Sequence, residues 1–203
     1  WHEIVNDELG GVPATVTYCP LCNSALVFDR RFEGRMLDFG TTGKLRNSDL
    51  VMYDRQTESW WQQFTGEAII GKMTGTLLTA LPSRVESFER FLARTATHEG
   101  ATVLVPTFAS MRNYGANPYS RYDRSTKPFL YSGELPQNIA PLARVVVVGK
   151  EAWSLELVQR LKRIERGDLI ITWEAGQNSA LDTTMISMGR DIGNVVVQRQ
   201  GAD

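Results

Sequence analysis

Cysteine and histidine are scarce in this sequence. Its 203 residues contain two cysteines and two histidines. A zinc site made of four cysteines is therefore excluded, and a nucleophile–histidine–acid triad has few ways to form. The sequence also has no phosphate loop, dinucleotide fingerprint, Gly-x-Ser-x-Gly elbow or His-Glu-x-x-His motif. The common catalytic templates are thus missing.

Long apolar runs and an excess of one charge are missing too. Lys and Arg number 22 against 23 Asp and Glu, a net charge of −1. This balance argues against nucleic acid or an anionic membrane surface as the main partner. The longest apolar candidate, Val145–Val148, is far shorter than the roughly 20 residues of a membrane span. We predict no nucleic-acid partner and no transmembrane segment in this chain.

Short β-type runs separated by glycines fill the first 80 positions, and strands alternate with a helix in the last third. The clearest helix of the first half spans Ser83–Ala96, with Ser83 and Glu86 as a capping box. We also expect a strand at Thr102–Val105. The pattern predicts a β-rich α+β fold with two or three packed helices. The main predicted strands are Ala14–Tyr18, Ser24–Phe28, Leu50–Asp54, Glu67–Gly71, Arg144–Val148, Asp168–Trp173 and Asn194–Arg199, and the second helix is Ser154–Ile164.

A short sequence repeat relates the two ends of the chain. Asn23-Ser24-Ala25-Leu26 recurs as Asn178-Ser179-Ala180-Leu181, and at the same offset Gly34-Arg35 matches Gly189-Arg190. We interpret this as a duplication of a strand–turn–strand unit; the alternative is convergence on the same turn chemistry. We expect one compact domain over residues 1–203, with related halves at about 1–80 and 144–203. A helix and a proline- and tyrosine-rich loop join them.

The chain opens on Trp1-His2-Glu3-Ile4-Val5, without an initiator methionine. Such an opening is typical of the middle of a structured element. We therefore expect that the domain is truncated at its N-terminus.

The two cysteines stand together in Cys19-Pro20-Leu21-Cys22. This spacing allows two thiolates to bind one zinc or copper ion, to form a disulfide, or to act as a redox dithiol. A third donor for a metal would come from His2, a methionine or a carboxylate. We favour His2 over His98, since His98 follows a helix and nothing local returns it to the cysteines. The interpretation as a redox dithiol is less favoured, because a predicted strand follows Cys22 and a redox dithiol normally lies at a helix N-terminus.

Aromatic and acidic residues form two further candidate sites. Asp54, Trp60 and Trp61 follow a predicted strand and are candidates for lining a ligand cleft. The other interpretation is an aspartate that caps a turn and two tryptophans in the core. Tyr114 and Tyr119 lie in a turn-rich segment that is either a lid or a packed loop.

Several blocks resemble the bacterial and archaeal family known as domain of unknown function 3179. They are Glu3-Ile4-Val5-Asn6-Asp7, Tyr18-Cys19-Pro20-Leu21-Cys22, Met52-Tyr53-Asp54-Arg55-Gln56-Thr57 and Gly66-Glu67-Ala68-Ile69. The resemblance covers most of the chain. It implies an extracytoplasmic protein, periplasmic or secreted, and no settled activity.

The leading hypothesis is an extracytoplasmic protein that binds copper or zinc through Cys19, Cys22 and His2, with a metal-donor or metal-acceptor protein as partner. One alternative is a non-catalytic scaffold domain with a Cys19–Cys22 disulfide, which binds its partner through aromatic residues. A second alternative is a thiol–disulfide oxidoreductase.

Overall fold

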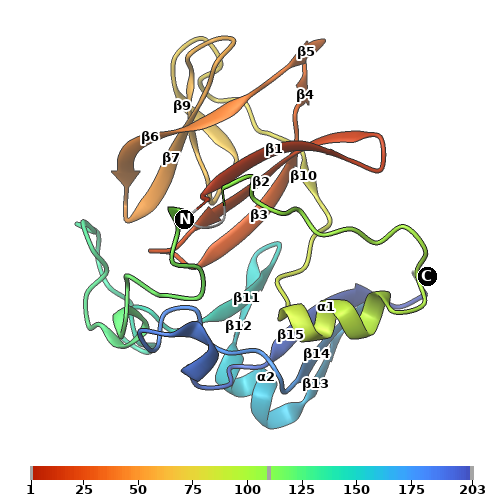
Figure 1. Cartoon of the computed structure of the whole chain (residues 1–203). Helices are drawn as coiled ribbons and strands as arrows, with labels where there is room; N and C mark the ends of the chain where they lie inside the picture. Colours follow the sequence, from red (N-terminus) through yellow and green to blue (C-terminus); the bar gives the residue numbers. More distant parts are fainter. Residues whose placement is uncertain (1, 109–110, 202–203) are drawn as a thin grey trace. The chain divides into compact units, whose positions relative to one another are not determined.

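Antiparallel strands with short connections make up most of the structure, a computed structural model that describes residues 2–108 and 111–201. The chain divides into two units (Figure 1). Unit 1 comprises Trp1–Ser83 and Ser125–Gln137, and unit 2 comprises Arg84–Arg124 and Asn138–Asp203. The β-rich character predicted from the sequence is confirmed. The single domain remains a prediction.

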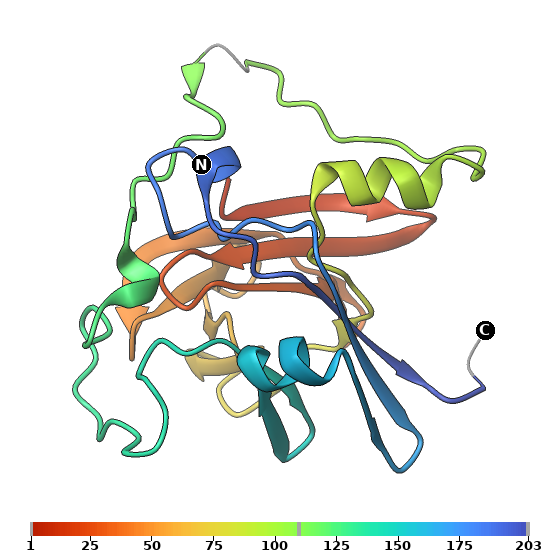
Figure 2. The ribbon, with the colours of Figure 1, turned by 90° about the horizontal axis from the view of Figure 1, so that it is seen from below.

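The first sheet of unit 1 carries the cysteine pair at the end of its second strand. A long hairpin opens this sheet, and its register pairs Ile4 with Thr17 and Leu9 with Val12. The hairpin is the red pair of ribbons in Figure 2. It turns at Gly10 and Gly11, both of which have positive φ, a backbone conformation that glycine adopts without strain. The strand order is β1 (Ile4–Leu9), β2 (Val12–Cys19), β3 (Ser24–Asp29) and β10 (Ala80–Leu81).

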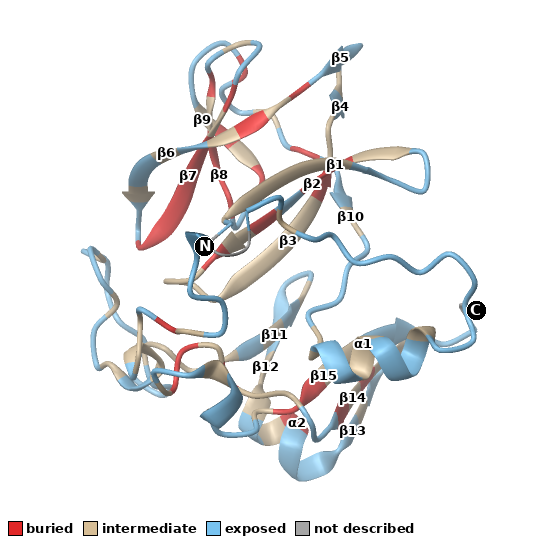
Figure 3. Ribbon diagram, in the orientation of Figure 1, coloured by how far each residue is buried: buried red, intermediate tan, exposed pale blue. Residues whose placement is uncertain are grey.

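The second sheet of unit 1 supplies about half of the buried residues in that unit's hydrophobic core. Its strand β7 is buried over nearly its whole length (Figure 3). Trp61 is fully buried, and the rings of Phe32 and Phe39 meet it edge-on at 5.8 and 6.0 Å. The strand order is β6 (Phe39–Arg46), β7 (Asp49–Asp54), β8 (Trp60–Gln62) and β9 (Glu67–Ile70), and a small hairpin is formed by β4 (Arg31–Phe32) and β5 (Arg35–Met36).

Unit 2 packs one helix and two small sheets around Val158, Ile171 and Trp173. Its hairpin of β11 (Val145–Val148) and β12 (Glu151–Ser154) leads into α2 (Leu155–Leu161). The second sheet has the order β13 (Arg163–Arg166), β14 (Leu169–Glu174) and β15 (Asn194–Arg199). Within the described residues, unit 2 also contains α1 (Phe88–Thr95) and two short 3₁₀ helices, Tyr122–Arg124 and Ile186–Met188. Within the described residues, no helix is both long enough and apolar enough for a membrane crossing.

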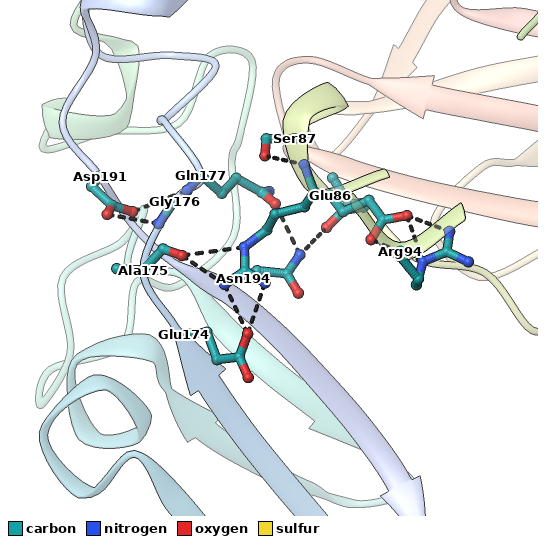
Figure 4. A network of polar contacts seen from close by, with 11 residues as sticks. Glu86, Ser87, Arg94, Glu174, Ala175, Gly176, Gln177, Asp191 and Asn194 are labelled. Carbon is teal, nitrogen blue, oxygen red and sulfur yellow. Dashed lines mark hydrogen bonds and ion pairs between the residues drawn. The ribbon is translucent and has the colours of Figure 1, made fainter. Parts of the chain in front are cut away.

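Polar contacts rather than buried apolar residues fix α1 within unit 2. The helix has no buried residue. Arg90 donates to the Glu174 carboxylate at 2.8 Å, and the Asn194 amide donates to the Val85 carbonyl at 2.9 Å (Figure 4). The Ser87 hydroxyl caps the helix by accepting from the Arg90 backbone N–H. The helix therefore depends on side chains of β14 and β15.

Three predicted elements are wrong at their boundaries or in kind. The second helix, predicted over Ser154–Ile164, ends at Leu161 as α2, and Ile164 belongs to β13. The helix of the first half begins at Phe88 with Ser87 as its cap, so Ser83 and Glu86 do not form the capping box. Thr102–Val105 is not a strand in the structure. A β-branched run becomes a strand only where a neighbouring strand accepts and donates its backbone hydrogen bonds, and local sequence does not encode that neighbour.

The internal duplication is not confirmed. Each unit contains a three-stranded antiparallel meander, β1-β2-β3 in one and β13-β14-β15 in the other. However, Ser24–Leu26 belong to β3 and Asn23 directly precedes it, whereas Asn178–Leu181 lies in the long connection between β14 and β15. The repeated residues therefore occupy different local structures.

Asp191 closes the connection between β14 and β15. Its carboxylate accepts hydrogen bonds from the backbone N–H groups of Gly176, Gln177 and Gly193 at 2.8, 3.1 and 2.8 Å (Figure 4 shows the first two). Burial alone would raise the pKa of Asp191, but these three donors outweigh it and lower the pKa. The ionised carboxylate is thus the form that stabilises the fold.

We expect Asp191→Asn to lower the free energy of unfolding by about 1 kcal/mol at neutral pH, because an amide accepts these bonds less well. The folded-state pKa lies below the unfolded value of about 4, so the wild-type contribution is present above that value and is lost as the pH falls through the folded pKa. Urea unfolding at several pH values should show the difference between the proteins narrowing in acid. Asp168→Asn, at an exposed ion pair with Arg199, is the matched control. A difference that stays constant with pH would contradict this assignment.

Candidate metal centre

Three donor groups from two turns of unit 1 converge on one point. The ligand atoms of Cys19, Cys22 and Asp49 all lie within 4.8 Å of one another. Cys19 ends β2, Cys22 lies in the turn before β3, and Asp49 begins β7. Cys19 is 1% exposed and Asp49 is 3% exposed, while Cys22 is half-buried. This group can hold a metal ion.

A strained turn places Asp49. The β6–β7 hairpin turns at Asn47 and Ser48, whose φ angles are 52° and 68°. A two-residue hairpin turn of this kind needs positive φ at both positions, and glycine usually supplies the second. Ser48 is buried and its side chain costs about 1–3 kcal/mol in this conformation. Its carbonyl oxygen lies 3.9 Å from the Cys19 sulfur.

The Cys22 sulfur is surrounded by hydrogen-bond acceptors. The Asp49 Oδ1 lies 3.1 Å from it and the Ser24 Oγ 3.2 Å. The Cys19 carbonyl oxygen lies at 3.9 Å and the Gln63 Oε1 at 4.0 Å. A thiol has one proton and can satisfy only one of these groups well at a time. The arrangement therefore has more acceptors than donors.

The two thiols hold their protons differently. The pKa of Cys19 is lowered, chiefly because the Cys22 thiol donates a hydrogen bond to the Cys19 sulfur. The same hydrogen bond and burial raise the pKa of Cys22. Both cysteines are free, so the disulfide expected in the scaffold alternative is not formed in this structure. Of the two thiols, the buried one therefore loses its proton more readily.

Asp49 has no cationic partner among residues 2–108 and 111–201. Its Oδ2 accepts from the Phe64 backbone N–H at 2.9 Å, and its Oδ1 lies 3.1 Å from the Cys22 sulfur. No ion pair of Asp49 with a basic side chain is found in that part of the chain. A buried carboxylate is costly unless hydrogen bonds and a positive charge compensate it. A metal ion would supply that charge.

His2 is exposed and lies outside this group of converging donors. The β1–β2 hairpin nevertheless links its neighbour Glu3 to Tyr18, the residue before Cys19. Ile4 pairs with Thr17, and the Tyr18 backbone N–H donates to the Glu3 carbonyl at 2.7 Å. One further pair in the same register would place His2 opposite Cys19. Its role as a ligand remains a prediction.

Asp54 and Trp61 are buried structural residues. Both are fully buried, and the Trp61 indole N–H donates to Asp54 Oδ2 at 2.9 Å. The same carboxylate accepts from the Thr57 backbone N–H and hydroxyl, so it fixes the turn between β7 and β8. The interpretation as a turn cap and a core tryptophan therefore describes them, and neither side chain is accessible enough to line an open cleft.

The remaining cleft candidates lie in different units. Trp60 is half-buried in unit 1, in the ladder between Tyr53 and Ile70. Tyr114 and Tyr119 belong to unit 2, where the Tyr119 ring meets Tyr122 at 6.5 Å. A ligand site for these three aromatic residues remains a prediction.

Sequence reasoning missed Asp49, Ser24 and Gln63. Asp49 is far from the cysteines along the chain, and a carboxylate was expected only as an unnamed donor. The one local signal is the pair Asn47-Ser48, which predicts a tight turn directly before Asp49. Nothing local indicates that this turn meets the cysteine turn.

The model of the family described as protein of unknown function (DUF3179) matches residues 1–202. The chain belongs to this family. The resemblance indicated by the Tyr-Cys-Pro-Leu-Cys block is therefore confirmed. No curated protein and no solved structure matches the chain. Because this DUF3179 family's description gives no activity, function has to be argued from the site.

We expect Asp54→Ala to lower the free energy of unfolding by about 2–4 kcal/mol, because it leaves the buried Trp61 N–H and the Thr57 donors without their acceptor. Urea unfolding followed by tryptophan fluorescence measures this. Asp168→Ala, which removes an exposed ion pair, should cost at most about 1 kcal/mol. Equal losses in the two variants would show that the Asp54 contacts do not stabilise the turn.

Proposed function

We propose that this protein binds a zinc or copper ion through Cys19, Cys22 and Asp49. The observation that carries the proposal is the excess of acceptors around the Cys22 sulfur, next to a buried carboxylate with no cationic partner among the described residues. One metal ion would bind both sulfurs and the Asp49 carboxylate, and it would supply the positive charge that this carboxylate lacks. The proposal includes an extracytoplasmic location, which rests on the family resemblance, and a metal-donor or metal-acceptor protein as partner.

Zinc is the first choice and copper the second. Two thiolates suit either metal, and thioether donors would favour copper(I). The third converging donor is instead the carboxylate of Asp49. Zinc commonly accepts thiolate, imidazole and carboxylate ligands in tetrahedral sites. The donor set therefore favours zinc.

A thiol–disulfide oxidoreductase is less well supported. Such an enzyme attacks its substrate with an accessible thiolate, usually placed at a helix N-terminus. Here the lowered pKa belongs to buried Cys19, and the pKa of the more exposed Cys22 is raised. Strand β3 rather than a helix follows Cys22. Both features lower the reactivity expected of a redox pair.

The direct test is metal analysis of protein purified without a metal-affinity tag, followed by titration with Zn²⁺ and with Cu⁺ under reducing conditions. We expect about one ion per chain. Cys19→Ser, Cys22→Ser and Asp49→Asn should each weaken binding by about 10- to 100-fold or more, since each removes a ligand. Asp7→Asn, at a strand position of β1 outside the group of converging donors, is the carboxylate control. Absence of binding in the wild-type protein, or unchanged affinity in all three variants, would refute the proposal.

His2 is proposed as the fourth donor, reached by one further pair in the β1–β2 register. We expect His2→Ala to weaken zinc binding about tenfold, whereas His98→Ala should leave it unchanged, because His98 is exposed and belongs to unit 2. Competition against a chelator of known affinity measures both variants. Equal affinities for the two variants and the wild-type protein would remove His2 from the ligand set and leave the three other donors in place.

A further inference from the structure

Beside the metal centre, the hydrogen-bond network fixes which way the Gln63 amide points. The Thr17 hydroxyl donates to the Leu26 carbonyl at 2.8 Å, so its single proton is already used. It must therefore accept from the Gln63 Nε2, which lies 2.9 Å away. Gln63 and Thr17 are both fully buried. The Gln63 Oε1 consequently points toward Ser24 and Cys22.

The Ser24 hydroxyl is shared between two neighbours. Its oxygen lies 2.7 Å from the Gln63 Oε1 and 3.2 Å from the Cys22 sulfur. An amide oxygen cannot donate, so the Ser24 proton points to Gln63. The hydroxyl oxygen then faces Cys22 as an acceptor, which suits a protonated thiol.

Metal binding changes the hydrogen bonding that the Cys22 sulfur requires. The metal–sulfur bond replaces the sulfur–hydrogen bond, and the proton leaves to solvent. The sulfur then accepts hydrogen bonds and no longer donates them. Ser24 has one proton for two acceptors, the Gln63 Oε1 and the Cys22 thiolate. As long as Gln63 holds that proton, the bound thiolate lacks a hydrogen bond that would stabilise it.

Resting on the metal centre proposed above, we propose that Gln63 holds the Ser24 hydroxyl away from the Cys22 thiolate and thereby keeps the bound ion exchangeable. Partners that orient metal ligands typically change metal affinity by about 10- to 100-fold. Here buried Gln63 destabilises the metal-bound state, because it holds the Ser24 proton away from the Cys22 sulfur. An exchangeable ion fits a protein that passes its metal to a thiol- or imidazole-bearing partner, and does not fit a permanent structural ion.

The test uses Gln63→Met, which keeps the side-chain volume and removes the amide oxygen. With Zn²⁺ bound, we expect release to excess chelator to slow about tenfold, because Ser24 is then free to donate to the thiolate. With Co²⁺ in place of zinc, the thiolate-to-metal charge-transfer band should move to higher energy. The double variant Ser24→Ala/Gln63→Met should lose both effects. Gln56→Met, at an exposed contact with Asp38, controls for the substitution itself.

Ser24→Ala alone keeps the test decisive if Gln63→Met fails to fold. Because Gln63 holds the hydroxyl proton in the wild-type protein, this variant should change the release rate by no more than about twofold. A tenfold faster release would show that Ser24 already donates to Cys22 and would overturn the proposal. So would a Gln63→Met variant that releases zinc at the wild-type rate. Failure of the wild-type protein to bind any metal would instead refute the metal centre itself.

Discussion

The burial of the Asp49 carboxylate beside two cysteine sulfurs is the constraint on which the site depends. Without a positive charge the arrangement is unfavourable, since a buried carboxylate loses its hydration and has no cationic partner among the described residues. The chain nevertheless maintains it with a strained turn at Ser48 and a fully buried amide at Gln63. Local strain and unpaired charge of this kind are typical of functional sites. Binding of a ligand there offsets their energetic cost.

Three separate parts of unit 1 have to meet for the site to exist. The β2–β3 turn brings the cysteines, the β6–β7 turn brings Asp49, and the end of β8 brings Gln63. Gln63 joins the two sheets directly, because its amide contacts Thr17 of β2 and Ser24 of β3. The residues that position the sulfurs therefore also hold unit 1 together. In unit 2 the corresponding end of β14 leads into a long connection closed by Asp191, and no cysteine is present there.

The sequence predicted those elements that local pattern determines. The β-branched run Val145–Val148 and the segment Asn194–Arg199 form β11 and β15 within the expected bounds. The cysteine pair was recognised as a site because it uses the whole cysteine content of the chain. Helix α1 was placed too early, since Ser83 and Ser87 both suit a helix cap and local sequence does not choose between them. The strand predicted at Thr102–Val105 is not formed, because no neighbouring strand among the described residues pairs with it.

What the sequence could not supply was long-range pairing. Asp49 joins the cysteines only because the β6–β7 turn packs against the β2–β3 turn, and no periodicity encodes that contact. X-ray absorption spectroscopy of the zinc-loaded protein tests the central claim most directly. The account predicts two sulfur neighbours at about 2.3 Å and nitrogen or oxygen neighbours at about 2.0–2.2 Å, with one oxygen lost in Asp49→Ala. A zinc shell without sulfur, or one unchanged by Asp49→Ala, would contradict it.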